Sequence, residues 1–524
     1  MRRTTSSTRI GRGVARRGEP GERGYILVMT AMLIVPMMLL AAMAIDYGGW
    51  YAEGTRMQKA ADAAALAGVV WLPNFQQASS VAKDTARQNG YDDAKTNIVV
   101  KVTQISETEL GVQITDSNSE VYLATFVKKT MSISRSASAK YVLPVPLGSP
   151  KNYFGTGPMI SGSDKENFFA AINGYCSYKA QGGPFEARYQ IPGIPSASHG
   201  SGNACTSSRT SNGDYHEDPD PAYQYYIELP PNRSQTMYFY IYNPHEDADD
   251  PTGYSSGQYS TTSFWLQAPD NTPFNDADNP LYGKPGSGGS CTGSGESNPR
   301  TYTASDNDAS FFSTSGWSRF CTFSTSAPPG KYILNVRTKD GEANSYATNA
   351  FSYLVQRSSS TTNATVCDTR TDSTCPAIYG KSWMSVYANA SGSSANFFLA
   401  KVGPEHAGKT LKITLFDPGE GGKSIRILDP GGNFASFRYQ DMGVNGDTPG
   451  SDLGPTTSLN VLNGTYNGKF VELTIQLPSN YASSSTFQNA GWWWKIQYNT
   501  DTGSVTDRTT WGVRVIGDPV HLTS

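Results

Sequence analysis

The residues best suited to covalent chemistry in this sequence are its six cysteines, whose thiols can pair as disulfides or bind a metal ion. Each consecutive pair brackets a loop-like stretch that is rich in glycine, serine or threonine. The pairing that we favour among the many that six cysteines allow is Cys176 with Cys205, Cys291 with Cys321, and Cys367 with Cys375. A zinc site is the alternative, but no CxxC spacing and no nearby pair of histidines supports it.

A second group of residues offers carboxylate and amide oxygens, which are the ligands that calcium prefers. It comprises Glu246, Asp247, Asp249, Asp250, Asp270, Asn271, Asn275, Asp276, Asp278 and Asn279. The spacing is not that of an EF-hand, and the tendency of Asp and Asn to form turns explains the composition as well as calcium does. We therefore assign no metal ligand and no cofactor to the chain.

Groups that could act as acid, base or nucleophile are scattered along the sequence. Its five histidines are His199, His216, His245, His406 and His521, and neither an HExxH nor a GxSxG motif occurs. The sequence thus gives no catalytic residue, and we predict that the protein is not an enzyme. A net charge of -3 with 17% charged residues also predicts no nucleic-acid partner.

Three consecutive tryptophans, Trp492, Trp493 and Trp494, are the aromatic residues best placed to face a sugar. Successive residues of a strand point to opposite faces, so at least one of the three is expected on the outer face. A packed edge or a domain contact is our preferred explanation, with a surface glycan as the alternative.

The first element that must position these residues is an uncharged apolar run over residues 25–45. A helix of this length, at about 1.5 Å per residue, crosses a hydrocarbon core of ~30 Å. Seven arginines and two glutamates precede the run, so the positive-inside rule predicts a cytoplasmic tail over residues 1–24 and an extracytoplasmic carboxyl-terminal part. A cleaved signal peptide with Ala42, Met43 and Ala44 as its site is the alternative, but the run is longer than a signal core.

Residues 54–70 follow with helix formers and many alanines, whose small side chains allow a close neighbour. That neighbour is either part of the same domain or another subunit. Residues 22–68, which include the apolar run and most of this helix, resemble the amino-terminal segment of the TadE/TadG-like Flp pilus-assembly family, and the TadG branch fits best. The matching positions are Gly24, Asp46, Gly48, Tyr51, Arg56, Gln58, Ala60, Ala61, Asp62, Ala63, Ala64, Ala65, Leu66, Ala67 and Gly68.

The resemblance implies a pilin-like or accessory membrane protein of the tight-adherence (Tad) system, which takes part in assembling, anchoring or initiating surface pili. It implies other Tad pilus proteins as partners and no enzymatic activity. A prepilin processing site has a glycine with a glutamate five positions later, whereas Met29 follows Gly24 and Ile26 follows Gly21 at that distance. We therefore expect the anchor to stay intact.

Alternating apolar residues predict three strands beyond the helix, at 97–104, 110–115 and 131–141, and a short amphipathic piece at 121–128. A helix followed by a small antiparallel sheet is a pilin-like α+β outline, which we assign to residues 46–146. Prolines at positions 144, 146 and 150 mark its end.

The rest of the chain predicts a duplicated, mainly-β ectodomain. Residues 237–244 resemble residues 411–418, and six apolar positions of one region align at a constant offset with six of the other. They are Tyr332, Leu334, Val336, Phe351, Tyr353 and Val355, which align with Trp492, Trp494, Ile496, Trp511, Val513 and Val515. We predict two tandem β-sandwich modules, jelly-roll-like in outline, at 147–365 with long disulfide-tied loops and at 366–524.

The sequence thus predicts a single-pass membrane protein, an accessory or minor pilin-like component of Tad (Flp) pilus assembly whose exported β modules make assembly or surface contacts. The alternative is a membrane-anchored adhesin or carbohydrate-binding surface protein, in which the amino-terminal segment only provides export. An exported hydrolase would need a convergent pocket that the sequence does not show.

Overall fold

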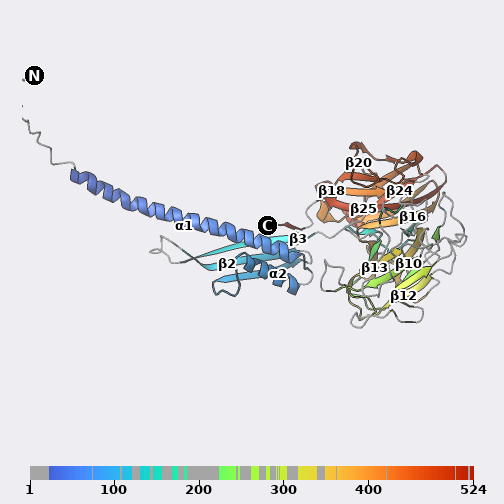
Figure 1. Cartoon of the computed structure of the whole chain (residues 1–524), viewed down its shortest axis with the longest axis horizontal. Coiled ribbons are helices and arrows are strands. Elements are labelled where there is room, and N and C mark those ends of the chain that lie inside the picture. The colour runs from blue at the N-terminus through green and yellow to red at the C-terminus, as the bar shows by residue number, and fades with distance from the viewer. Residues whose placement is uncertain are drawn as a thin grey trace, which may run out of the picture. The chain divides into compact units, whose positions relative to one another are not determined.

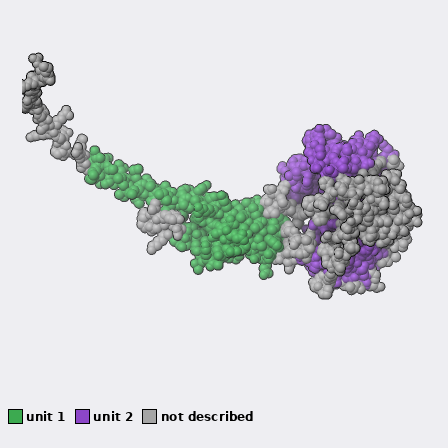
Figure 2. Space-filling model, in the orientation of Figure 1, with its two compact units in different colours: residues 1–141, 520–524 green, residues 142–519 purple. Residues whose placement is uncertain are grey.

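The structure, a computed structural model, describes most of the chain. The described residues are 23–72, 75–106, 109–120, 130–141, 145–155, 168–174, 182–185, 223–242, 246–247, 261–270, 279–283, 291, 293, 296–303, 317–338, 348–360, 363–419, 422–501, 503–516 and 520–523. The chain forms two compact units, residues 1–141 with 520–524 and residues 142–519, which Figure 2 colours green and purple.

The first unit is built on one long helix, α1 (Arg23–Val69). The predicted span and the predicted juxtamembrane helix are therefore two halves of a single uninterrupted element, which extends well past the small sheet in Figure 1. A second helix, α2 (Phe75–Gln88), packs on α1 and buries Ala78, Ala82 and Ala86. These three alanines are spaced four residues apart and so lie on one face of the helix.

The sheet of the first unit has the order β1 (Ile98–Ser106), β2 (Glu109–Glu120), β3 (Thr130–Tyr141) and β26 (Val520–Leu522), with antiparallel neighbours. The first three are the predicted strands, while the predicted piece at 121–128 lies outside the described residues. One sheet face carries buried apolar residues such as Val100 and Val112, and the other carries exposed polar residues such as Lys101 and Gln113. Such one-sided patterning is typical of an antiparallel sheet that is covered on a single face.

The second unit contains two large antiparallel sheets, which we call the first and the second head sheet. In the described part of the chain, the first head sheet has the order β11 (Arg300–Thr303), β10 (Thr261–Gln267), β13 (Gly330–Thr338), β7 (Gln224–Leu229), β15 (Ala377–Gly380), β4 (Leu147–Gly148), β17 (Ser394–Lys401), β24 (Trp493–Asn499), β19 (Ser424–Leu428) and β22 (Leu459–Asn460).

The second head sheet has the order β12 (Trp317–Phe323), β8 (Met237–Tyr242), β14 (Thr348–Gln356), β6 (Phe168–Asn173), β16 (Trp383–Ser391), β25 (Ser504–Ile516), β18 (Thr410–Phe416), β23 (Phe470–Gln476), β20 (Phe437–Gly443) and β21 (Leu453–Thr456). Two short strands, β5 (Tyr153–Phe154) and β9 (Glu246–Asp247), also pair with β14. Short helices occupy connections near the carboxyl-terminal end, namely η4 (Pro404–His406), η5 (Leu462–Gly464), η6 (Tyr481–Ser483) and α3 (Ser485–Asn489).

Each head sheet contains the same order of strands twice, and the second copy is read from the opposite edge of the sheet. The run β10-β13-β7 corresponds to β19-β24-β17, and β8-β14-β6 corresponds to β18-β25-β16. The predicted sequence alignment equates β13 with β24 and β14 with β25, in agreement with this order. The mainly-β region expected from the duplication is thus present as two copies of one strand arrangement.

The two copies share both head sheets. In the second head sheet β6 pairs directly with β16, so that Ala170 lies opposite Val386. In the first head sheet β15 and β4 lie between β7 and β17. One continuous core contains buried residues of both copies, including Phe168, Phe351 and Trp511. The proposed division of the sequence at 365/366 stays a prediction, while the fold joins the copies within one unit.

Candidate functional site

The alanine-rich half of α1 packs inside its own unit. Ala61, Ala64 and Gly68 are buried together with Ala60 and Ala65, facing α2 and the sheet. A Cβ atom at Gly68 would lie 2.7 Å from Leu110 Cδ2, 2.8 Å from the Ala78 carbonyl oxygen and 2.9 Å from Ala82 Cβ. The small residues on this face of the motif therefore allow α1, α2 and β2 to approach closely. Of the two neighbours that the sequence allowed, the same domain or another subunit, the structure shows the same domain.

Two polar motif residues join α1 to the sheet. The Gln58 side-chain amide donates to Asp62 Oδ1 at 2.8 Å and to the Ser136 carbonyl oxygen at 3.0 Å. Asp62 lies one helical turn after Gln58. It orients the Gln58 amide, because the two amide hydrogens are then directed to two fixed acceptors, Asp62 Oδ1 and the Ser136 carbonyl oxygen. Gln58 and Asp62 therefore position β3 against the helix.

Glu53 forms another link that the sequence did not reveal. Its carboxylate accepts a hydrogen bond from the Tyr91 hydroxyl at 2.7 Å and lies 3.6 Å from the Arg56 guanidinium. Burial, followed by the hydrogen bond to Glu53, raises the pKa of Tyr91 above its usual range. Tyr91 lies just beyond α2 and far from Glu53 in sequence, so no local spacing could have indicated this contact.

A second group of motif residues points away from the unit. Tyr51 is 70% exposed, no atom lies within 4 Å of a Cβ built on Gly48, and the Arg56 side chain is 76% exposed. Asp46, by contrast, is buried. Of the remaining motif positions, Gly24 lies in the first turn of α1, and Leu66 and Ala67 are partly buried.

The amino-terminal half of α1 has the length and composition of a membrane span. Its most apolar window of 18 residues is entirely unburied in the structure, and no other helix among the described residues meets these criteria. Side chains such as Leu27, Leu33 and Leu40 are more than half exposed, which is unfavourable in water and favourable in a lipid environment.

Two of the three predicted disulfides are present. Cys291 is bonded to Cys321 and Cys367 to Cys375, with Cα atoms 4.4 Å and 5.8 Å apart. Cys176 and Cys205 lie outside the described residues, so their pairing stays a prediction. Both observed bonds lie in the second unit.

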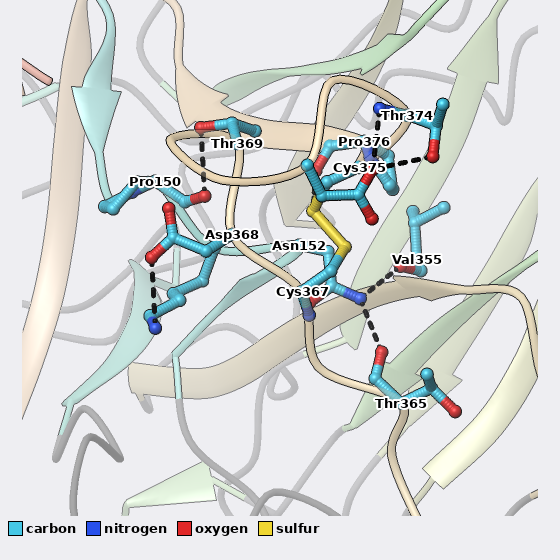
Figure 3. Close-up of a disulfide and its surroundings, with 12 residues drawn as sticks. Pro150, Asn152, Val355, Thr365, Cys367, Asp368, Thr369, Thr374, Cys375 and Pro376 are labelled. Atoms are coloured by element: carbon cyan, nitrogen blue, oxygen red, sulfur yellow. Dashed lines mark hydrogen bonds and ion pairs between the residues drawn. A yellow bond between two sulfur atoms is a disulfide. The ribbon is translucent and has the colours of Figure 1, made fainter. Parts of the chain in front are cut away.

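The loop closed by the Cys367–Cys375 disulfide is held by an asparagine that is far away in sequence, as Figure 3 shows. The fully buried Asn152 donates to the carbonyl oxygens of Val355 at 2.7 Å and Thr365 at 2.9 Å, and its Oδ1 accepts from the Cys367 N–H at 2.9 Å. Lys151 forms an ion pair with Asp368, in which Nζ lies 3.2 Å from Oδ2. The first strands of the unit are thereby tied to the segment that connects the two copies.

Replacing Asn152 with alanine should lower the stability of the second unit by about 1–3 kcal/mol, because it leaves buried backbone groups without partners. Urea unfolding of the purified chain measures this loss. Asn152→Asp is the matched variant, since it keeps the acceptor for Cys367 and loses both donors. Equal stability of the alanine variant and the native protein would show that the asparagine does not hold the loop closed by the Cys367–Cys375 disulfide.

The other candidate residues form no site in the described part of the chain. No group of three or more His, Cys, Asp or Glu residues there could hold a metal ion. Most of the acidic cluster, namely Asp249, Asp250, Asn271, Asn275, Asp276 and Asp278, lies outside the described residues, as do His199, His216 and His245. Trp492, Trp493 and Trp494 are all buried, but Trp492 and Trp494 belong to the main core of the head, whereas Trp493 lies outside it. Trp493 is covered because it packs against Phe398, next to Arg370.

Residues 24–74 match the sequence model of the Tad family, described as Flp pilus-assembly TadE/G-like. The matched segment is about a tenth of the 524-residue chain and coincides with α1 and the turn after it. The predicted resemblance of the amino-terminal segment to this family is thus confirmed. No curated protein matches the chain.

Proposed function

We propose that this protein is a membrane-anchored accessory or minor pilin-like component of the Tad (Flp) pilus assembly system. Its second unit, which we call the head (residues 142–519), is exported and makes assembly or surface contacts. The observation that carries the proposal is the coincidence of the family match with α1, a helix that is unburied and apolar in one half and packed on a small sheet in the other.

Charge and disulfides support an orientation with the amino terminus in the cytoplasm. The arginines precede the apolar run, and both observed disulfides lie in the head. Disulfides persist in oxidising compartments outside the cytoplasm, and arginine-rich flanks stay on the cytoplasmic side. Protease treatment of intact cells tests this orientation, because a carboxyl terminus protected from the protease would contradict it.

The exposed motif positions supply the surface for a Tad partner. The alanine face of α1 is occupied by its own unit, so a partner would meet Gly48, Tyr51 and Arg56 instead. A double Tyr51→Ala, Arg56→Ala variant should reduce the number of pili per cell while leaving the protein level unchanged. Lys59→Ala is the matched control, because Lys59 is also exposed on α1 and lies outside the motif.

A variant that lacks the head, which we call the headless chain, distinguishes the adhesin alternative from the assembly role. Tyr141 and Val520 are direct partners in the sheet, so residue 144 can be joined to residue 517 to leave a short hairpin connection and an intact first unit. If the head makes assembly contacts, cells with the headless chain should make fewer pili. Normal pili with lost glycan binding would favour the adhesin function, and normal pili in cells that lack the whole chain would contradict the assembly role.

A further inference from the structure

The last residues of the chain belong to the first unit and not to the head that precedes them. Strand β26 pairs antiparallel with β3, with Val520 opposite Tyr141 and Leu522 opposite Ala139. Figure 1 places the carboxyl terminus beside β3. Directly opposed Cα atoms of antiparallel strands lie about 4.5–5.5 Å apart, so the chain leaves the first unit and returns to it at nearly the same point.

The residue after β26 extends the pairing with β3 and adds a contact to one further strand, β2. The Thr523 backbone N–H donates to the Ser138 carbonyl oxygen at 2.7 Å, and its hydroxyl donates to Glu109 Oε1 on β2 at 2.9 Å. Strand β26 also lies against α1. Although short, the terminal segment therefore engages β2, β3 and α1.

This pairing is one of three ways in which the outer edge of β3 is closed. Every second residue of an antiparallel strand directs its backbone N–H and C=O groups to the same side. The carbonyl oxygens of Ser134, Ser136 and Ser138 therefore all point to this edge. The first accepts from the Arg135 guanidinium at 2.9 Å, the second from Gln58 at 3.0 Å and the third from Thr523 at 2.7 Å. An open strand edge would be a template for pairing with another chain.

We propose that β26 is a latch that mounts the head at both of its ends and closes the edge of β3. The head is then an insertion between the third and fourth strands of the small sheet. Because residues 520–522 are synthesised after the head, the small sheet is completed only after the head has been made. The latch concerns the connection between strands and is independent of membership in the Tad system.

A disulfide between the opposed positions tests the latch in the full chain. Ala139→Cys with Leu522→Cys places two cysteines on directly facing residues, within the range of Cα separations that disulfides require. Ala139→Cys with Thr523→Cys is the matched control, because a shift of one residue turns the side chain to the opposite sheet face. We expect a cross-link several times more abundant in the first variant, identified by mass spectrometry of the linked peptides. Equal cross-linking in both variants would overturn the latch.

Cleavage of the first connection then tests the two-point mount. A site for a specific protease is inserted at residues 142–144 of the cross-linked variant. After cleavage, the head of the cross-linked variant should stay with the membrane fraction in denaturant until a reductant is added, whereas denaturant alone should release the head of the control variant, which only the pairing of β26 with β3 holds. Release of the cross-linked head before reduction would show that the terminal segment is not joined to the first unit.

Deletion of residues 520–524 provides a readout that needs no new cysteine. Hydrogen exchange should become faster at residues 138–141, where β26 pairs, and stay unchanged at Val112 in the middle of the small sheet. Unchanged exchange at residues 138–141 would contradict the latch, even if the deleted chain still supports pili.

Discussion

Replacing Gly68 with valine should destabilise the first unit by about 3 kcal/mol, because the added side chain overpacks the contact between α1 and α2. Already at the first added carbon, the Ala78 carbonyl oxygen would be 2.8 Å away, and a backbone atom cannot turn aside as a flexible side chain can. Relief of this clash requires α2 to move away from α1. Hydrogen exchange of the α2 amides in the full chain measures the effect, which should appear as faster exchange.

Gly48→Val is the matched control for this prediction. Gly48 lies in the same helix, but no atom is within 4 Å of the position that a Cβ would take there. The change at Gly48 should therefore leave the exchange of α2 unaffected. A reduction in pili with Gly48→Val and normal α2 protection would indicate contact with a partner at this position. Normal α2 protection in Gly68→Val would contradict the packing role of the motif.

The second large effect is expected at Trp511, a fully buried residue where the two copies of the strand arrangement meet within the head. Its indole N–H donates to the Tyr498 hydroxyl at 3.0 Å, and its ring lies 6.3 Å from that of Phe168 and 6.2 Å from that of Phe397. Phe168 belongs to β6 of the first copy, whereas Trp511 belongs to β25 of the second. Trp511→Ala should cost about 3–5 kcal/mol through the cavity that it leaves.

This loss should be shared by both copies, because β6 and β16 pair directly and the core is continuous. We expect a single unfolding transition in urea, with strands β14 and β18 losing protection from hydrogen exchange together. Trp511→Phe serves as the control, since it removes the hydrogen bond to Tyr498 and keeps most of the buried area. Loss of protection in β18 with native protection in β14 would show that the copies unfold independently.

Long elements with strong patterning could be predicted from the sequence. The apolar run, the three strands of the small sheet and the aligned strands of the two copies all have enough alternating or continuous apolar residues to be recognised. Two of the disulfides could be predicted because each joins cysteines that are consecutive along the sequence. The motif could be recognised as a family segment, but its division into buried and exposed positions required the fold.

Elements that depend on distant partners were missed. Helix α2 buries only alanines, so no large apolar side chain marks the face that packs on α1. Strands β4 and β15 have two and four residues, too few to show a period, although they join the first head sheet across the copies. The pairing of β26 with β3 is set by tertiary contacts and leaves no trace in a three-residue strand.

The uninterrupted course of α1 has a mechanical consequence. A helix of 47 residues is about 70 Å long, at ~1.5 Å per residue. Pro36 lies within the apolar half, but no loop separates the helix after this proline from the half that carries Gln58 and Gly68, so the part of α1 beyond Pro36 has no joint to absorb a displacement. A push or tilt applied to the helix within the bilayer would be delivered to α2 and the small sheet as a rigid movement, so α1 would act as a lever as well as an anchor.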